Sequence, residues 1–172
     1  SGIIVSRGGE VRFLHLTFQE YLAARAIAGL PDGQQHAFLI GGGKIYRPEW
    51  REVMLLLGGV LMEQGKAKVD SLIAAILNQL GENPTLAERA RCTGLIGAMI
   101  LDLRPLDYRV QDERYRLNLN ALLPMFEAAH AESVELQVRL EAAEALGQAG
   151  DPRLLRDNWV TIPAGKFPMG AQ

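Results

Sequence analysis

Apolar residues recur at helical spacing through the middle of the chain. In residues 69–80 they follow the i, i+3, i+4, i+7 pattern without a break, which predicts an amphipathic helix. Residues 48–65 are apolar on nearly every side, and Pro48 stands where a proline begins a helix without losing a hydrogen bond. A helix this apolar is expected to be buried on more than one side.

A third helix is predicted for residues 85–103. Thr85 and Glu88 have the spacing of a capping box, in which each side chain accepts a hydrogen bond from a backbone N–H at the helix start. Gly94 and Gly97 each cost about 1 kcal/mol of helix propensity. Their small size would let a neighbouring helix approach closely.

The N-terminal residues alternate instead of following helical spacing. Two short apolar runs, residues 3–5 and 11–16, flank a pair of glycines that supplies the positive φ angles of a tight hairpin turn. Thr17 and Glu20 then have capping-box spacing, which predicts a helix N-cap at Thr17. The apolar face of this helix is expected to pack into the core and to consist of Phe18, Tyr21, Leu22 and Ala26.

Two other segments carry weaker patterns. Residues 31–47 are rich in glycine and are expected to form a loop interrupted by a short apolar run, residues 37–40, with residues 41–44 exposed and flexible. Their Gly41-Gly42-Gly43-Lys44 run lacks the glycine spacing and the following Ser or Thr of a phosphate-binding loop. Residues 106–118 are polar and charged, and a helical pattern interrupted by Pro124 resumes at residues 119–131.

Composition narrows the classes of function. The 18 basic and 20 acidic residues are well mixed, so there is no electrostatic footprint for nucleic acid or an anionic membrane. The longest apolar stretch, residues 53–62, is far shorter than the roughly 20 residues of a membrane span. Cys92 is the only cysteine, which excludes an internal disulfide and suits a reducing compartment. We expect a cytoplasmic protein without a membrane or nucleic-acid partner.

Residues 13–24, FLHLTFQEYLAA, resemble a known family signature. The signature is F-x-H-x-[ST]-F-Q-E-[FY]-x-A-A of the NACHT-type STAND NTPases, the signalling ATPases that include the animal NOD-like receptors. There it marks the end of the winged-helix domain and the start of the next helical domain. Residues 48–57, PEWREVMLLL, resemble the W-R-E-V-x-x-L segment of bacterial NACHT proteins. The resemblance implies that the hairpin is the wing and that the nucleotide-binding core lies upstream.

Two further resemblances concern the C-terminal part. Residues 138–153 resemble a HEAT-like repeat, V-R-x-x-A-A-x-A-L-G-x-x-G-D-P-R, with Gly150 as a left-handed cap and Pro152 starting the next helix. One such unit cannot bury its own apolar face and must stack on neighbours. Residues 158–170 resemble the W-V-x-I-P-A-G-x-F-x-M-G opening of the formylglycine-generating-enzyme/sulfatase-modifying family, whose fold is C-type-lectin-like. That family's catalytic cysteines lie near the far end of its domain, and none is present here.

His15 is the strongest candidate for a binding residue. In the NACHT family the matching histidine reaches the β-phosphate of bound ADP. A histidine suits this role because it can donate a hydrogen bond to phosphate and gains charge easily. The alternative is a structural histidine at a strand-to-helix junction.

Four further residues are candidates for contacts with neighbouring domains, namely Phe18, Glu20, Tyr21 and Trp50. No catalytic residue and no metal site is nominated, since His36, His130 and Cys92 are too scattered in sequence. Glu141 and Glu144 are three residues apart, but the alanines around them favour a solvated helix face.

We therefore expect a mainly α-helical chain, an α-solenoid or HEAT-like stack in three parts. Residues 1–16 would be the β-hairpin remnant of a winged helix and residues 17–156 the helical domain. Residues 157–172 would be an extended tail, the first strand of a truncated formylglycine-generating-enzyme-like domain. Upstream NTPase and downstream domains would be its partners in cis.

The expected function of this chain is non-enzymatic. It would relay between the nucleotide switch of a STAND NTPase and a downstream sensor or effector in signal transduction, as in prokaryotic immunity. The chain itself would hold no cofactor, whereas the parent protein would bind ADP or ATP with Mg, hydrolyse ATP or GTP, and homo-oligomerise on activation. The alternatives are part of a formylglycine-generating enzyme, or a HEAT-repeat scaffold for a lectin-like ligand-binding domain. DNA binding through the winged helix is disfavoured by the net charge of −2.

Overall fold

The computed structural model describes residues 4–7, 10–13, 15–154 and 161–165, and these residues are mainly helical. The strands are β1 Ile4–Arg7 and β2 Glu10–Phe13. The α-helices are α1 Leu16–Ala28, α2 Asp32–His36, α3 Arg51–Gln64, α4 Lys66–Leu77, α5 Leu86–Leu103, α6 Glu113–Asn120, α7 Ala128–Ala131 and α8 Leu136–Ala149. Short π-helical and 3-10 turns link them at Ala37–Gly41, Lys44–Tyr46, Pro48–Trp50, Arg104–Leu106 and Leu123–Phe126. No helix in these described ranges has the length and apolar content that crossing a bilayer requires.

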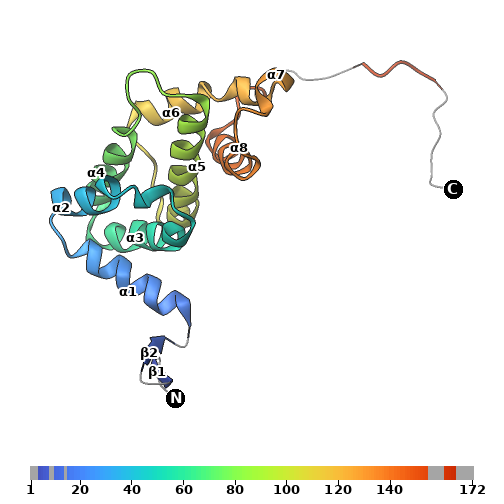
Figure 1. Cartoon of the computed structure of the whole chain (residues 1–172). Helices are drawn as coiled ribbons and strands as arrows, with labels where there is room; N and C mark the ends of the chain where they lie inside the picture. The colour runs from blue at the N-terminus through green and yellow to red at the C-terminus, as the bar shows by residue number, and fades with distance from the viewer. Residues whose placement is uncertain (1–3, 8–9, 14, 155–160, 166–172) are drawn as a thin grey trace.

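Helix α5 packs on α3, α4, α6 and α8, whereas α1 packs on α3 (Figure 1). The predicted capping box starts α5: the Glu88 N–H donates to Thr85 Oγ1 at 3.2 Å, and the Thr85 N–H donates to Glu88 Oε2 at 2.8 Å. These bonds satisfy backbone donors that the first helical turn leaves unpaired. The expected helix of residues 85–103 is confirmed by this structure.

The closest helix contact joins α5 to α8. A Cβ atom built on Gly97 would lie 2.3 Å from the Cβ of Ala145, and one built on Gly94 would lie 3.0 Å from the Cβ of Glu141. Real Cβ atoms do not approach as closely as 2.3 Å, so glycine is required at position 97, whereas a side chain at position 94 would be tight against α8. The prediction that these glycines admit a neighbouring helix is confirmed.

Helices α3 and α4 form the other side of the core. The expectation that α3 is buried on more than one side is confirmed, because α3 packs on α1, α4 and α5 and because Leu55 and Leu56, beside its fully buried face, are partly buried against the core. The amphipathic pattern of α4 buries Val69, Leu72, Ile73 and Ile76. This helix ends at Leu77, so the last apolar position of the pattern, Leu80, lies in the turn that follows.

The expected loop over residues 31–47 is wrong. Helix α2 and two short helical turns occupy most of it, with Leu39 fully buried as an apolar anchor. Lys44 Nζ donates to the Phe38 carbonyl oxygen at 2.9 Å and lies 4.2 Å from the Phe38 ring centroid. The glycines therefore shape a packed turn, with Gly43 in the left-handed region at φ 60°.

The next helix begins earlier than expected. Helix α6 begins at Glu113, within the polar segment, because Asp112 Oδ1 accepts the Arg114 N–H at 3.0 Å as an N-cap. Only Tyr115 and Leu119, one turn apart, bury a large apolar side chain on this helix. Two apolar positions among charged neighbours do not make a recognisable helical pattern in the sequence. Residues 119–131 instead hold the end of α6, a 3-10 turn and the short α7.

Strands β1 and β2 lie beyond the N-terminal end of α1, away from the helical body (Figure 1). They pair antiparallel, with Arg7 opposite Glu10. Residues 161–165 of the tail have no regular structure and are exposed, and the other residues of the expected first strand lie outside the described part. The assignments to a winged helix, a HEAT-like stack and a lectin-like domain stay predictions, as do the three domain boundaries.

Candidate docking surfaces and cavities

His15 lies where β2 passes into α1. Its backbone is extended (φ −125°, ψ 133°), and it serves as the N-cap of α1 without a capping bond from its side chain. The expected N-cap at Thr17 is therefore wrong, because Leu16 is already helical. The His15 imidazole is exposed, and its ring centroid lies 6.2 Å from that of Phe18.

The first turns of α1 carry apolar side chains that no described residue covers. Leu16 is 64% exposed, Phe18 41% and Leu22 49%. The expected core face is wrong for Phe18, Leu22 and Ala26, because only the second half of α1 packs on α3, where it buries Ala24, Ile27 and Ala28. The first half of α1 extends past the body towards the hairpin (Figure 1).

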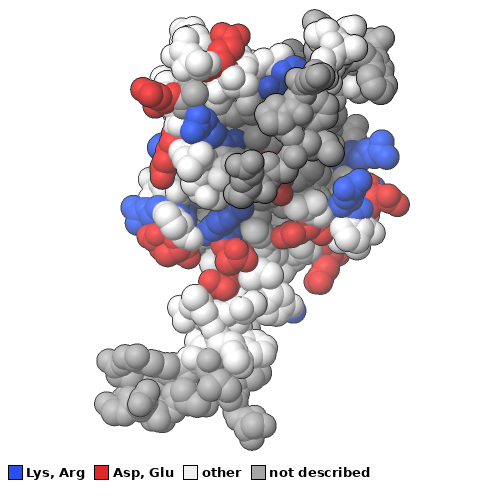
Figure 2. Space-filling model, turned by 90° about the vertical axis from the view of Figure 1, so that its right-hand side faces the viewer, with Lys and Arg blue, Asp and Glu red and all other residues white. Residues whose placement is uncertain are grey.

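The surface of this projecting half has little charge. In Figure 2 the narrow part of the molecule below the body is almost entirely white, whereas acidic and basic side chains alternate over the body above it. Tyr21 is half-buried and packs against the core, and its hydroxyl accepts a hydrogen bond from Arg25 Nη1 at 3.4 Å. Glu20 makes no ion pair with a described residue. We call Leu16, Phe18 and Leu22 the α1 face.

Trp50 belongs to a cluster within the chain. Its ring meets the Phe38 ring edge-on, with centroids 5.6 Å apart, and Lys44 Nζ lies 5.7 Å from the Trp50 centroid. Cation–π contacts of this kind hold the turn before α3 on the segment after α2. Its expected contact with another domain stays a prediction.

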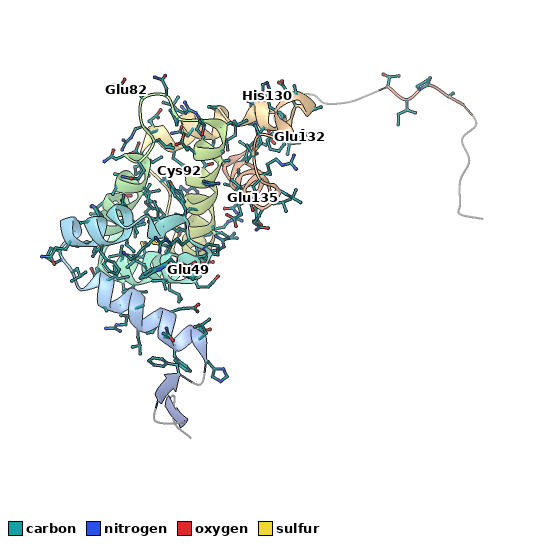
Figure 3. The ribbon with its side chains drawn as sticks, in the orientation of Figure 1. Glu49, Glu82, Cys92, His130, Glu132 and Glu135 are labelled. Atoms are coloured by element: carbon teal, nitrogen blue, oxygen red, sulfur yellow. The ribbon has the colours of Figure 1, made fainter. Side chains whose placement is uncertain are left out.

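The other side chains that could act as nucleophiles or metal ligands lie far from one another in the structure. Cys92 is fully buried among the helices, whereas His130 lies within α7 at the outer edge (Figure 3). Burial raises the pKa of the Cys92 thiol to about 11, so it packs as a small apolar residue. Glu141 is partly buried and Glu144 exposed. In the part of the chain that the structure describes, no three His, Cys, Asp or Glu side chains are grouped to hold a metal ion.

Sequence reasoning missed two cavities of about 480 Å³ each. The first, here called the arginine cavity, lies where the end of α5, α6 and the end of α8 meet, and it is lined by Arg104, Arg109 and Arg116. The second, here called the α3–α8 cavity, is bordered by Arg47, Arg51, Arg91, Glu135 and Glu141. The arginines of each cavity are scattered in sequence, so no motif marks them.

The charges of the α3–α8 cavity are used within the chain. Arg51 Nη2 lies 3.5 Å from Glu141 Oε1, and Arg47 Nη2 donates to the Gly42 carbonyl oxygen at 3.4 Å. With two glutamates facing three arginines, the cavity carries little surplus charge. Its polar groups therefore serve mainly to join α8 to the start of α3.

Comparison with protein-family models, with curated proteins and with solved structures gives no match for this chain.

Proposed function

We propose that this chain is the non-catalytic coupling segment of a STAND-type signalling NTPase. The observation that carries the proposal is the α1 face, an apolar surface on a helix that projects from its own body. The NACHT-like motif indicates what would cover the α1 face. The motif includes these same residues and implies a nucleotide-binding domain directly upstream. The α1 face would dock on that domain.

The energetics favour such docking. Fully burying a Leu or Phe side chain stabilises by about 1.5–3 kcal/mol. Leu16, Phe18 and Leu22 are roughly half exposed, so covering them recovers on the order of half of that for each. Without a docked domain, the apolar side chains at this end of α1 stay in contact with water.

His15 fits a contact with nucleotide in the same assembly. Its imidazole is exposed at the start of α1, and no described residue takes up its ring nitrogens. It can therefore donate a hydrogen bond to a phosphate oxygen. The remaining groups around ADP or ATP and Mg would come from the upstream domain.

The coupling role follows from where the two ends lie. Helix α1 is at one end of the body, and α8, which resembles a HEAT-like unit, leads into the tail at another (Figure 1). Helix α5 packs tightly on α8 at Gly94 and Gly97. This packing makes the helical body between α1 and α8 stiff. A shift of the upstream domain on α1 would then move the tail as well.

The test uses the natural-length protein, with bound nucleotide measured after denaturing extraction. We expect co-purified ADP in the wild type, less ADP with faster ATP exchange in His15→Ala, and similar loss in Leu22→Asp on the α1 face. Leu136→Asp is the matched control, because Leu136 is 61% exposed on α8, away from α1. A wild type without nucleotide would refute the STAND proposal. Normal ADP retention in Leu22→Asp would refute docking through the α1 face.

A further inference from the structure

The arginine cavity joins residues 100–119 to the end of α8, about thirty residues further along the chain. Its lining comes from the end of α5 with the segment that follows, from α6, and from Gln148 and Ala149 at the end of α8. A volume of about 480 Å³ is within the range of sites for small organic molecules, roughly 300–1,000 Å³.

Part of the cavity wall is apolar. Ile100, Leu101 and Val110 border it, and Leu101 is 42% exposed although its side chain is large and apolar. Leu119 closes this wall from α6 and is itself buried. The apolar part of a ligand could cover this wall. Binding would then be favoured because apolar surface is removed from water.

The rim of the cavity is basic. Arg104, Arg109 and Arg116 line it together with a single acid, Asp107. Arg116 lies 3.5 Å from Glu113, but neither the Arg104 nor the Arg109 guanidinium group bonds to any described residue. Two uncommitted guanidinium groups at one cavity are suited to a carboxylate or a phosphate, which they can bind through paired hydrogen bonds.

Tyr115 adds a polar group at the same cavity. It is only 7% exposed, and its hydroxyl makes no hydrogen bond to a described residue. Burial raises the pKa of this phenol, so it stays protonated and can donate. A ligand at the cavity can accept a hydrogen bond from this hydroxyl.

We propose that the arginine cavity binds a small organic anion. The apolar body of the ligand lies against Leu101 and Val110, and Arg104 and Arg109 hold its carboxylate or phosphate. The inference does not depend on the proposed function. A ligand in this place contacts α5, α6 and α8 at once, and therefore stabilises the joint from which the tail departs.

The test measures binding of four related probes to the 172-residue chain by titration calorimetry. The probes are 2-naphthoate, 2-naphthyl phosphate, uncharged 2-naphthol and inorganic phosphate. We expect one or both naphthyl anions to bind at least about tenfold more tightly than 2-naphthol and inorganic phosphate, because a hydrogen bond to a charged group adds to the apolar contact. The stronger of the two identifies the preferred anionic group.

Variants locate the site. Arg104→Gln/Arg109→Gln is expected to lower the affinity for the better anion by about tenfold or more, and Tyr115→Phe by a few-fold. The matched control, Arg47→Gln/Arg91→Gln at the α3–α8 cavity, is expected to bind like the wild type. Circular dichroism checks that each variant is folded. The proposal is overturned if neither anion binds, if 2-naphthol binds equally well, or if Arg104→Gln/Arg109→Gln keeps full affinity. Should that variant not fold, unchanged affinity in Tyr115→Phe overturns it.

Discussion

Gly97→Ala tests the packing on which the helical body depends. The substitution adds one methyl group to the face of α5 that meets α8. That methyl carbon would lie 2.3 Å from the Cβ and 2.9 Å from the Cα of Ala145, and 3.3 Å from the Tyr115 hydroxyl oxygen. Because an alanine and backbone atoms oppose it, no rotamer change relieves the clash.

The expected cost follows from two opposing terms. Overpacking a core costs about 1–3 kcal/mol, and a clash with backbone places this variant near the upper end. Replacing a mid-helix glycine by alanine returns about 1 kcal/mol of helix propensity. The net destabilisation is therefore about 2 kcal/mol, which corresponds to a fall in Tm of about 4–8 °C for a chain of this size.

The assay is thermal and urea unfolding followed by far-ultraviolet circular dichroism. Gly59→Ala is the matched control, since Gly59 is within α3 and a Cβ there meets nothing within 4 Å. This control is expected to be more stable than the wild type by about 0.5–1 kcal/mol. The loss caused by Gly97→Ala should be smaller when it is measured in an Ala145→Gly background, because the atom in closest contact is then absent.

One result would refute the reasoning about the α5–α8 contact. If Gly97→Ala were as stable as the wild type, or gained stability like Gly59→Ala, the two helices would not be in the close contact that the structure gives them. A loss of stability that Ala145→Gly does not reduce would show that the cost arises elsewhere.

Three smaller predictions follow from single contacts. Thr85→Ala removes the hydroxyl that accepts the Glu88 N–H and should lower the free energy of unfolding by about 1 kcal/mol in urea titrations. Cys92, whose pKa burial raises to about 11, should react with an aromatic disulfide reagent at neutral pH only as the chain unfolds; fast labelling of the native chain would contradict its burial. The hydrogen bond from Lys68 lowers the pKa of Asp32, so its contribution to stability is present above about pH 4 and is lost as the pH falls through the folded-state value. Urea midpoints should therefore differ between Asp32→Asn and the wild type at neutral pH, and that difference should shrink in acid.

The sequence predicted those elements whose local signals agree with one another. The helix of α5 followed from its capping box and apolar spacing, and the buried helix α3 followed from its continuous apolar run. Local signals failed where one turn of burial decided the structure, as in α6, whose charged surface concealed the Tyr115 and Leu119 stripe. They also failed at α1, where the spacing of apolar residues is helical but says nothing of how far the helix projects.

By itself, the sequence determined that the chain is mainly helical, that α5 begins at a Thr85 cap and that Gly94 and Gly97 admit a neighbour. These properties depend on hydrogen bonds and side chains within one turn, which sequence spacing encodes directly. Only the tertiary structure decided that α8 is that neighbour, that Phe18 and Leu22 stay exposed, and that scattered arginines gather at one cavity. The physical reason is that these features depend on how whole helices pack, because packing brings together residues that no local pattern connects.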